Sequence, residues 1–207
     1  MKRFRLFWCA AVLFPFLAAC NVNVIPPTDY NETRTFDLAS PVPLGELPFF
    51  VEVETFTNEC SGRFKMIVRE DANRIWVDEY NRWAMTPGAM LTKYLASRFA
   101  AQSGNRRDQD GKPVFVLDGS VLNCELNKAK KQVVLQVHFF IIEPGSGNSF
   151  RITGTEDCAV PVDDTTAEAF ADGLNKAAEI FSDRVAALLK DELKKRAAEA
   201  NAVPEKK

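Results

Sequence analysis

The chain has 207 residues and lacks the signatures of several enzyme classes. It has one histidine, no Cys-x-x-Cys pair, no phosphate-binding GxxxxGK[ST] loop and no GxSxG nucleophile elbow. Its nearest match to that elbow, "GSGNS" at residues 145–149, has the wrong order and predicts a hairpin turn. These absences argue against an ATPase and a serine hydrolase. We assign no catalytic residue and no metal ligand, and we interpret His138 as structural or exposed.

Two further absences exclude other classes of function. No basic patch with interleaved aromatic residues is present, and the 26 basic residues are outnumbered by 28 acidic ones, so no nucleic-acid partner is expected. No apolar run of about 18 residues follows Cys20, which argues against a permease.

The N-terminus has the layout of an export signal. Basic residues at positions 2, 3 and 5 precede an apolar run, Leu6–Ala19, that ends in Leu-Ala-Ala-Cys. This ending resembles the bacterial lipobox, which implies cleavage before Cys20 and acylation of its thiol. The alternative is an ordinary cleavable signal in which Cys20 is incidental.

A lipid on Cys20 would anchor the mature chain stably in a membrane. This covalent lipid is the only expected attachment, and no other cofactor is predicted. Asn21 follows in place of aspartate, and by resemblance to enterobacterial sorting this favours the outer membrane over the inner one, with the domain in the periplasm. Loss of the signal leaves 23 basic against 28 acidic residues, a formal net charge of −5.

Composition divides the chain into four parts. Residues 1–19 are the predicted signal, 20–32 a tether stiffened by two prolines, 33–193 one folded domain, and 194–207 a charged tail expected to fray.

The order of elements predicts an α+β domain, a mostly antiparallel sheet with two helices packed on one face. One helix should begin at Thr86-Pro87, and a longer one at a capping box formed by Thr165 and Glu168. Alternating hydrophobicity predicts strands at residues 33–38, 49–56, 64–70, 74–78, 113–126, 132–142 and 149–155. Gly119 is predicted to form a bulge.

Cys60, Cys124 and Cys158 remain once the signal is removed and Cys20 is acylated. Three cysteines in an oxidising compartment suggest one disulfide and one thiol, with a zinc site as the rival interpretation. If the first helix is a crossover, the strands before Cys60 and around Cys124 run parallel and adjacent, which predicts a Cys60–Cys124 disulfide. The strand at 132–142 should separate Cys158 from Cys124, although Cys158 becomes a rival partner for Cys60 if the strand order differs.

One segment, "IWVDEYNRWAMTPGAMLTKYL" at residues 75–95, is more specific than composition requires. Its step Asn81-Arg82-Trp83-Ala84, between a strand and a capped helix, resembles the ABC-type transport auxiliary lipoproteins (the paraquat-inducible-protein-C-like family). The lipobox, the strand meander and the long C-terminal helix agree with that family, whereas the three extra cysteines and the charged tail depart from it. We interpret the four motif residues as structural, with Trp83 packing the first helix onto the sheet; a partner contact is the alternative.

The resemblance implies a non-catalytic component of an envelope lipid-transport system. The implied partners are a mammalian-cell-entry-type substrate-binding protein and an inner-membrane ABC permease and ATPase, with the lipoprotein docking or holding the outer-membrane end of the conduit. Self-association is compatible with this role. The alternatives are an assembly lipoprotein that supports an outer-membrane barrel, and a lipid-binding carrier with an apolar cavity between sheet and helices.

Overall fold

The computed structural model describes residues 31–99, 111–145 and 151–202. The chain divides into two units, Met1–Glu32 and Thr33–Lys207, and every helix and strand of the described residues belongs to the second. The predicted lipobox with Cys20 lies outside the described residues.

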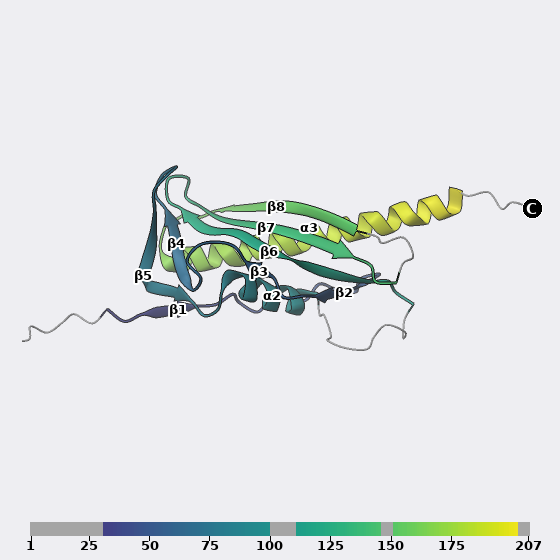
Figure 1. Cartoon of the computed structure of the whole chain (residues 1–207), viewed down its shortest axis with the longest axis horizontal. Helices are drawn as coiled ribbons and strands as arrows, with labels where there is room; N and C mark the ends of the chain where they lie inside the picture. Colours follow the sequence, from purple (N-terminus) through teal and green to yellow (C-terminus); the bar gives the residue numbers. More distant parts are fainter. Residues whose placement is uncertain (1–30, 100–110, 146–150, 203–207) are drawn as a thin grey trace, which may run out of the picture. The chain divides into compact units, whose positions relative to one another are not determined.

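The described part of this second unit contains eight strands and two helices (Figure 1). In chain order they are β1 (Arg34–Phe36), β2 (Phe50–Val53), β3 (Thr57–Asn58), β4 (Lys65–Arg69), β5 (Ile75–Trp83), α2 (Pro87–Arg98), β6 (Val114–Asn127), β7 (Gln132–Ile142), β8 (Arg151–Pro161) and α3 (Ala167–Ala202).

All eight strands belong to one mixed sheet with the order β1-β5-β4-β6-β7-β8, and β2 and β3 pair with β6 beside this path. The longest ladders, β6–β7 and β7–β8, are antiparallel, as is β4–β5. The pairs β1–β5, β2–β6, β3–β6 and β4–β6 are parallel. The predicted α+β class with a mostly antiparallel sheet is therefore confirmed.

The core lies between the sheet and the two helices. The alternation predicted for β7 is confirmed, since Val133, Leu135, Val137, Phe139 and Ile141 are all buried. The apolar stripe of α3 is buried from Phe170 to Val185 and continues at Leu189, whereas Leu188 is only partly buried. Aromatic side chains fill the space between the layers, and Phe181 of α3 contacts the rings of Phe56 and Phe139.

The helix starts agree with the sequence in one case and differ in the other. Thr86 is the N-cap of α2, with Pro87 in its first turn, as predicted. The predicted Thr165–Glu168 capping box is wrong, because the Thr166 hydroxyl accepts the Ala169 N–H at 3.2 Å. Glu168 is engaged elsewhere, in an ion pair with Arg34.

Three strand predictions also need correction. The short strand expected at 74–78 extends to Trp83, and the strand expected to end at residue 155 continues to Pro161. The bulge predicted at Gly119 falls instead between Val121 and Asn123. Gly119 is needed for another reason, because a Cβ there would lie 2.2 Å from the carbonyl oxygen of His138 on β7.

One residue and one segment also differ from expectation. Phe64, the first residue of the strand predicted at 64–70, is 48% exposed, because it lies in the turn before β4. The charged sequence from Lys194, expected to fray, is helical as far as Ala202, and the Arg196 guanidinium pairs with Glu143 at 2.6 Å.

Candidate functional site

The motif residues form the end of β5, where this strand holds the first strand of the domain. β1 pairs in parallel with the motif, so that Arg34 lies opposite Asn81 and Phe36 opposite Trp83. The ladder continues one residue further, since the Ala84 N–H donates to the Phe36 carbonyl at 2.7 Å. The motif therefore fastens the strand that follows the predicted tether.

Trp83 supplies the apolar part of this fastening. Its side chain is 1% exposed, and its ring meets that of Phe170 edge to face at 5.0 Å between centroids. Phe170 belongs to α3, so this aromatic contact joins the sheet to the second helix, a contact that the sequence did not predict. Such a buried pair contributes both apolar area and a favourable ring geometry.

Asn81 supplies the polar part. Its side-chain oxygen accepts from Arg34 Nε at 3.0 Å, and its amide nitrogen donates to Asp78 Oδ2 at 2.7 Å. Arg34 reaches in turn to Glu168 in the first turn of α3. One connected set of side chains thus joins β1, β5 and α3.

Arg82 points in a different direction and lines a surface groove of about 540 Å³. We call this the motif groove; its lining residues are Gly62, Arg63, Phe64, Lys65, Asp78, Glu79 and Arg82. A register shift between Lys65 and Ile67 separates β5 locally from β4. The Asp78 carboxylate supports the displaced segment by accepting the backbone N–H groups of Tyr80 and Asn81 at 2.9 and 3.0 Å.

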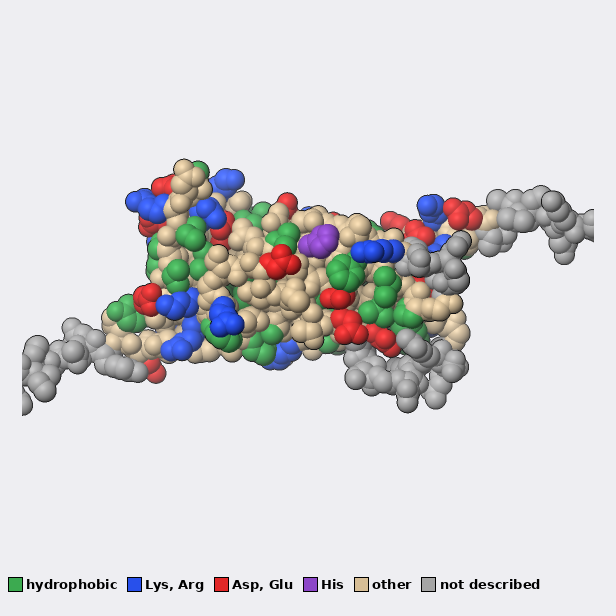
Figure 2. Space-filling model, viewed as in Figure 1, with side chains coloured by type: hydrophobic (Ala, Val, Ile, Leu, Met, Phe, Trp, Pro, Cys, Tyr) green, Lys and Arg blue, Asp and Glu red, His purple; other side chains and the backbone are tan. Residues whose placement is uncertain are grey.

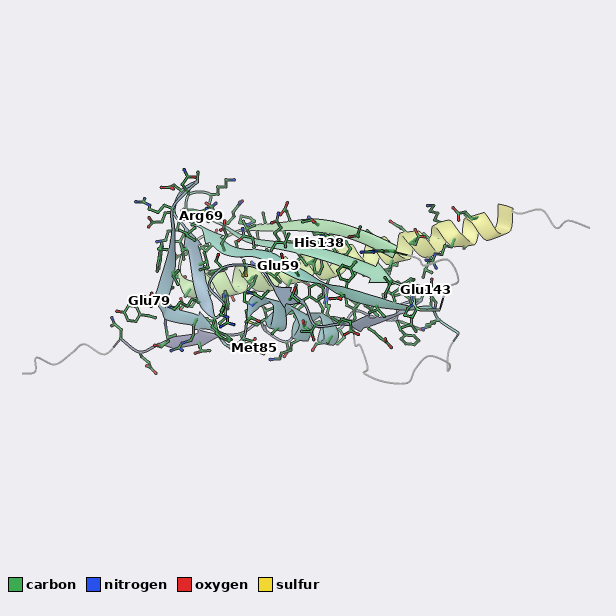
Figure 3. The ribbon with its side chains drawn as sticks, viewed as in Figure 1. Glu59, Arg69, Glu79, Met85, His138 and Glu143 are labelled. Atoms are coloured by element: carbon green, nitrogen blue, oxygen red, sulfur yellow. The ribbon has the colours of Figure 1, made fainter. Side chains whose placement is uncertain are left out.

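The charges of the motif groove are not balanced. Lys65 and Arg82 are direct cross-strand neighbours, a placement that is unfavourable for like charges. Lys65 pairs with Glu79 at 2.9 Å, but among the described residues neither Arg63 nor Arg82 has an ion-pair partner. Figure 3 labels Glu79 on β5, and Figure 2 shows basic side chains, with acidic ones among them, over the part of the unit formed by β1, β4 and β5. The groove can therefore receive an acidic group.

The three cysteines lie in the arrangement on which the disulfide prediction depends. β3 runs parallel to β6, and the Cys60 N–H that follows it donates to the Val121 carbonyl at 3.1 Å. Leu135 of β7 separates Cys124 from Cys158 in register. Cys60 packs against the core that contains Cys124. All three are free thiols in the structure, so the Cys60–Cys124 bond stays a prediction.

Burial makes these thiols poorly reactive. It raises the pKa of Cys124 well above the ordinary thiol value and the pKa of Cys158 to about 11. The pKa of Cys60 is also raised by burial, and its thiol donates to Asn58 Oδ1 at 3.3 Å. Because the thiolate is the reacting form, spontaneous oxidation at neutral pH would be slow.

No group of three His, Cys, Asp or Glu side chains among the described residues could hold a metal ion. His138 lies on the outer face of β7, with Nδ1 3.1 Å from the Thr155 hydroxyl (Figure 3).

Helices in the described ranges are too short or too polar to cross a membrane. Among the described residues, buried apolar side chains lie between the sheet and the helices, where a lipid carrier would need its cavity.

Solved structures share this α+β fold. The chain has a TM-score of 0.58 to an uncharacterised protein at 13% identity, covering 76% of this chain and 99% of the other. It has a TM-score of 0.54 to XCC0632 from Xanthomonas campestris, of the DUF330 family, at 14% identity, covering 79% and 99%. At this identity the likeness shows the fold alone. No curated protein matches the chain.

The family itself follows from the sequence. The family model of the ABC-type transport auxiliary lipoprotein component matches residues 62–186, and the chain belongs to this family. The match begins at the first residue of the motif groove and contains all of the meander β6–β8. Membership places the chain with auxiliary transport components and supports a location in the cell envelope.

Proposed function

We propose that this protein is a non-catalytic, lipid-anchored component of an envelope ABC-type lipid-transport system. Acylated Cys20 holds it in the outer membrane with the domain in the periplasm, where it docks or holds the outer-membrane end of the conduit. Its partners are a mammalian-cell-entry-type substrate-binding protein and an inner-membrane permease and ATPase. The family match over residues 62–186 is the observation that carries the proposal.

The attachment of β1 to β5 and α3 supports this role. A component that holds a conduit transmits force between its anchor and its folded domain. β1 is the strand nearest the predicted tether in sequence. Its ladder with β5 places Phe36 opposite Trp83, and the ion pair of Arg34 with Glu168 joins it to α3. Tethering also raises the effective concentration of the domain near a membrane partner.

The anchor is tested with Cys20→Ala in the full-length chain. We expect the protein to lose incorporated lipid and to move from the membrane fraction to the soluble periplasm, because the acyl chains are its membrane attachment. Metabolic lipid labelling and fractionation measure this. A Cys60→Ala variant is the matched control and should stay in the membrane. Unchanged labelling of the Cys20 variant would contradict the proposal.

The transport role is tested by capture of the native full-length protein from detergent-solubilised membranes. We expect a permease, its ATPase and a substrate-binding protein to be retained together. Retention of an outer-membrane barrel without these three would favour the assembly function instead. The double variant Arg63→Ala with Arg82→Ala tests in the same experiment whether the motif groove contacts a partner. It removes the two charges that have no ion-pair partner among the described residues, and it leaves Trp83 in place.

A further inference from the structure

β8 is an open edge of the sheet. It has 11 residues, it stands last in the strand order, and within the described ranges it pairs with β7 only. Figure 1 shows it as the outermost strand of the meander, with its second side free of any neighbouring strand. A long edge of this kind is a template for pairing with another chain.

The register shows which backbone groups face outward. Val162 N–H donates to the Lys131 carbonyl at 2.9 Å, which continues the β7–β8 ladder past Pro161. In an antiparallel pair the bonded positions alternate, so the even-numbered residues of β8 bond to β7 and the odd-numbered ones point away from it. Arg184 of α3 confirms this alternation, because its guanidinium reaches the outward carbonyl of Asp157 at 3.2 Å.

The outward residues also carry the exposed side chains. All odd-numbered positions of β8 are exposed, whereas the even-numbered ones are partly or fully buried. The edge ends at Pro161, which has no N–H to offer. Between Arg151 and Ala159 it presents backbone donors and acceptors together with two β-branched side chains, Thr153 and Thr155, that suit a strand interface.

We propose that β8 pairs antiparallel with β8 of a second copy of this chain, about a two-fold axis through Gly154. In this register Arg151 of one copy lies opposite Asp157 of the other, and Thr153 lies opposite Thr155. Opposite charges and paired threonines are both favourable across antiparallel strands. The same patch serves both copies, as a two-fold interface requires.

Charge selects this register over its neighbours. An axis at Thr153 would place Arg151 opposite Thr155, and an axis at Thr155 would place it opposite Ala159, so neither pairs the two charges. The Asp157 side chain has no ion-pair partner among the described residues, and Arg184 beside it is neutralised by Glu156 at 2.6 Å. The Asp157 carbonyl has a second lone pair for the ladder bond.

The register is tested in cells that make two differently tagged copies of the full-length chain. One copy carries Thr153→Cys and the other Thr155→Cys, which the proposal places directly opposite at about 5.5 Å between Cα atoms. Mild oxidation should link the two tags in one disulfide-bonded species. Thr153→Cys with Ala159→Cys is the control and should give no link above the background of the three native cysteines.

Two proline variants distinguish loss of dimer pairing from loss of folding. Thr153→Pro removes an outward N–H and leaves the β7 ladder intact, so the thermal midpoint should change little while the dimer is lost. Ile152→Pro is the contrasting variant, because it removes a ladder N–H and should destabilise the fold.

Arg151→Asp and Asp157→Arg should each weaken association, and the double variant should restore most of it.

The full-length protein in detergent should sediment as a dimer at tens of micromolar, and the Thr153→Pro variant as a monomer. A wild-type chain that sediments as a monomer and gives no linked species in cells overturns the proposal. So does a link that forms with Ala159→Cys but not with Thr155→Cys. A link from β8 to an unrelated protein alone would assign the edge to another partner and likewise reject the second copy.

Discussion

The meander β6–β8 and the motif end, which we define as β1, β4 and β5 with the first turn of α3, are built in different ways. The meander is continuous in sequence, and each strand pairs with the one that follows it through a long regular ladder. The motif end gathers distant segments, since Arg34 bonds to Asn81, 47 residues away, and to Glu168, 134 residues away. Its β4–β5 pairing is interrupted by a register shift.

This difference bears on stability and on function. Local pairing costs little loop-closure entropy, whereas contacts between distant segments must offset more of it. The motif end should therefore open more readily than the meander, although both are buried against the same core. The motif end contains the strand that follows the predicted tether. Its stability thus depends on a few long-range contacts.

The largest expected effect comes from Trp83→Ala. Removing a ring that is 1% exposed and packed on Phe170 should lower the free energy of unfolding by about 3–5 kcal/mol. Phe139→Ala in the meander is the matched variant and should cost a similar amount. Chemical denaturation measures both, and hydrogen exchange should show faster exchange of the β1 amides in the Trp83 variant only. Unchanged stability combined with lost partner capture would make Trp83 an interface residue.

The Cys60–Cys124 disulfide would join β3 covalently to the meander. On the chain-entropy model, closing this loop stabilises by about 4 kcal/mol. Peptide mapping of the non-reduced exported protein should find Cys60 linked to Cys124 and Cys158 free. Cys124→Ser in that protein should lower the thermal midpoint, and Cys158→Ser should do so less. Three free thiols, or a linked peptide containing Cys158, would contradict the prediction.

A smaller effect on stability is expected in the first turn of α3, which is part of the motif end. Thr166→Ala removes the hydroxyl that caps Ala169 and should cost about 1 kcal/mol of unfolding free energy. Thr165→Ala is the control and should cost much less, because it is the Thr166 hydroxyl that accepts the Ala169 N–H. Thermal unfolding of the two variants compares them directly, and the reverse order would restore the capping box that the sequence predicted.

The alternation of the chain was enough to predict much of the fold. β7 is found at its predicted bounds, 132–142, because one of its faces is buried and the other is not. Thr86 and Pro87 identified the start of α2 because their preference for a helix start is local. The strand order that separates Cys124 from Cys158 also followed from sequence, because consecutive strands in a meander are neighbours in space.

The motif could be recognised from sequence, but its surroundings could not. The contact of Trp83 with Phe170 of α3, 87 residues further along the chain, depends on how the long helix lies across the sheet. The motif groove was missed for the same reason, since a register shift brings Arg63 near Arg82 and no periodicity encodes it.

The sequence by itself determined the class of the fold, the meander of its last three strands and the family resemblance, because these depend on local patterns and on a short motif. Only the tertiary structure decided which residues meet across long distances and which edge of the sheet stays open. A strand's alternation reports that one face is buried, but not which neighbour lies at each edge. Both the motif groove and the open β8 edge depend on which strands become neighbours in the sheet.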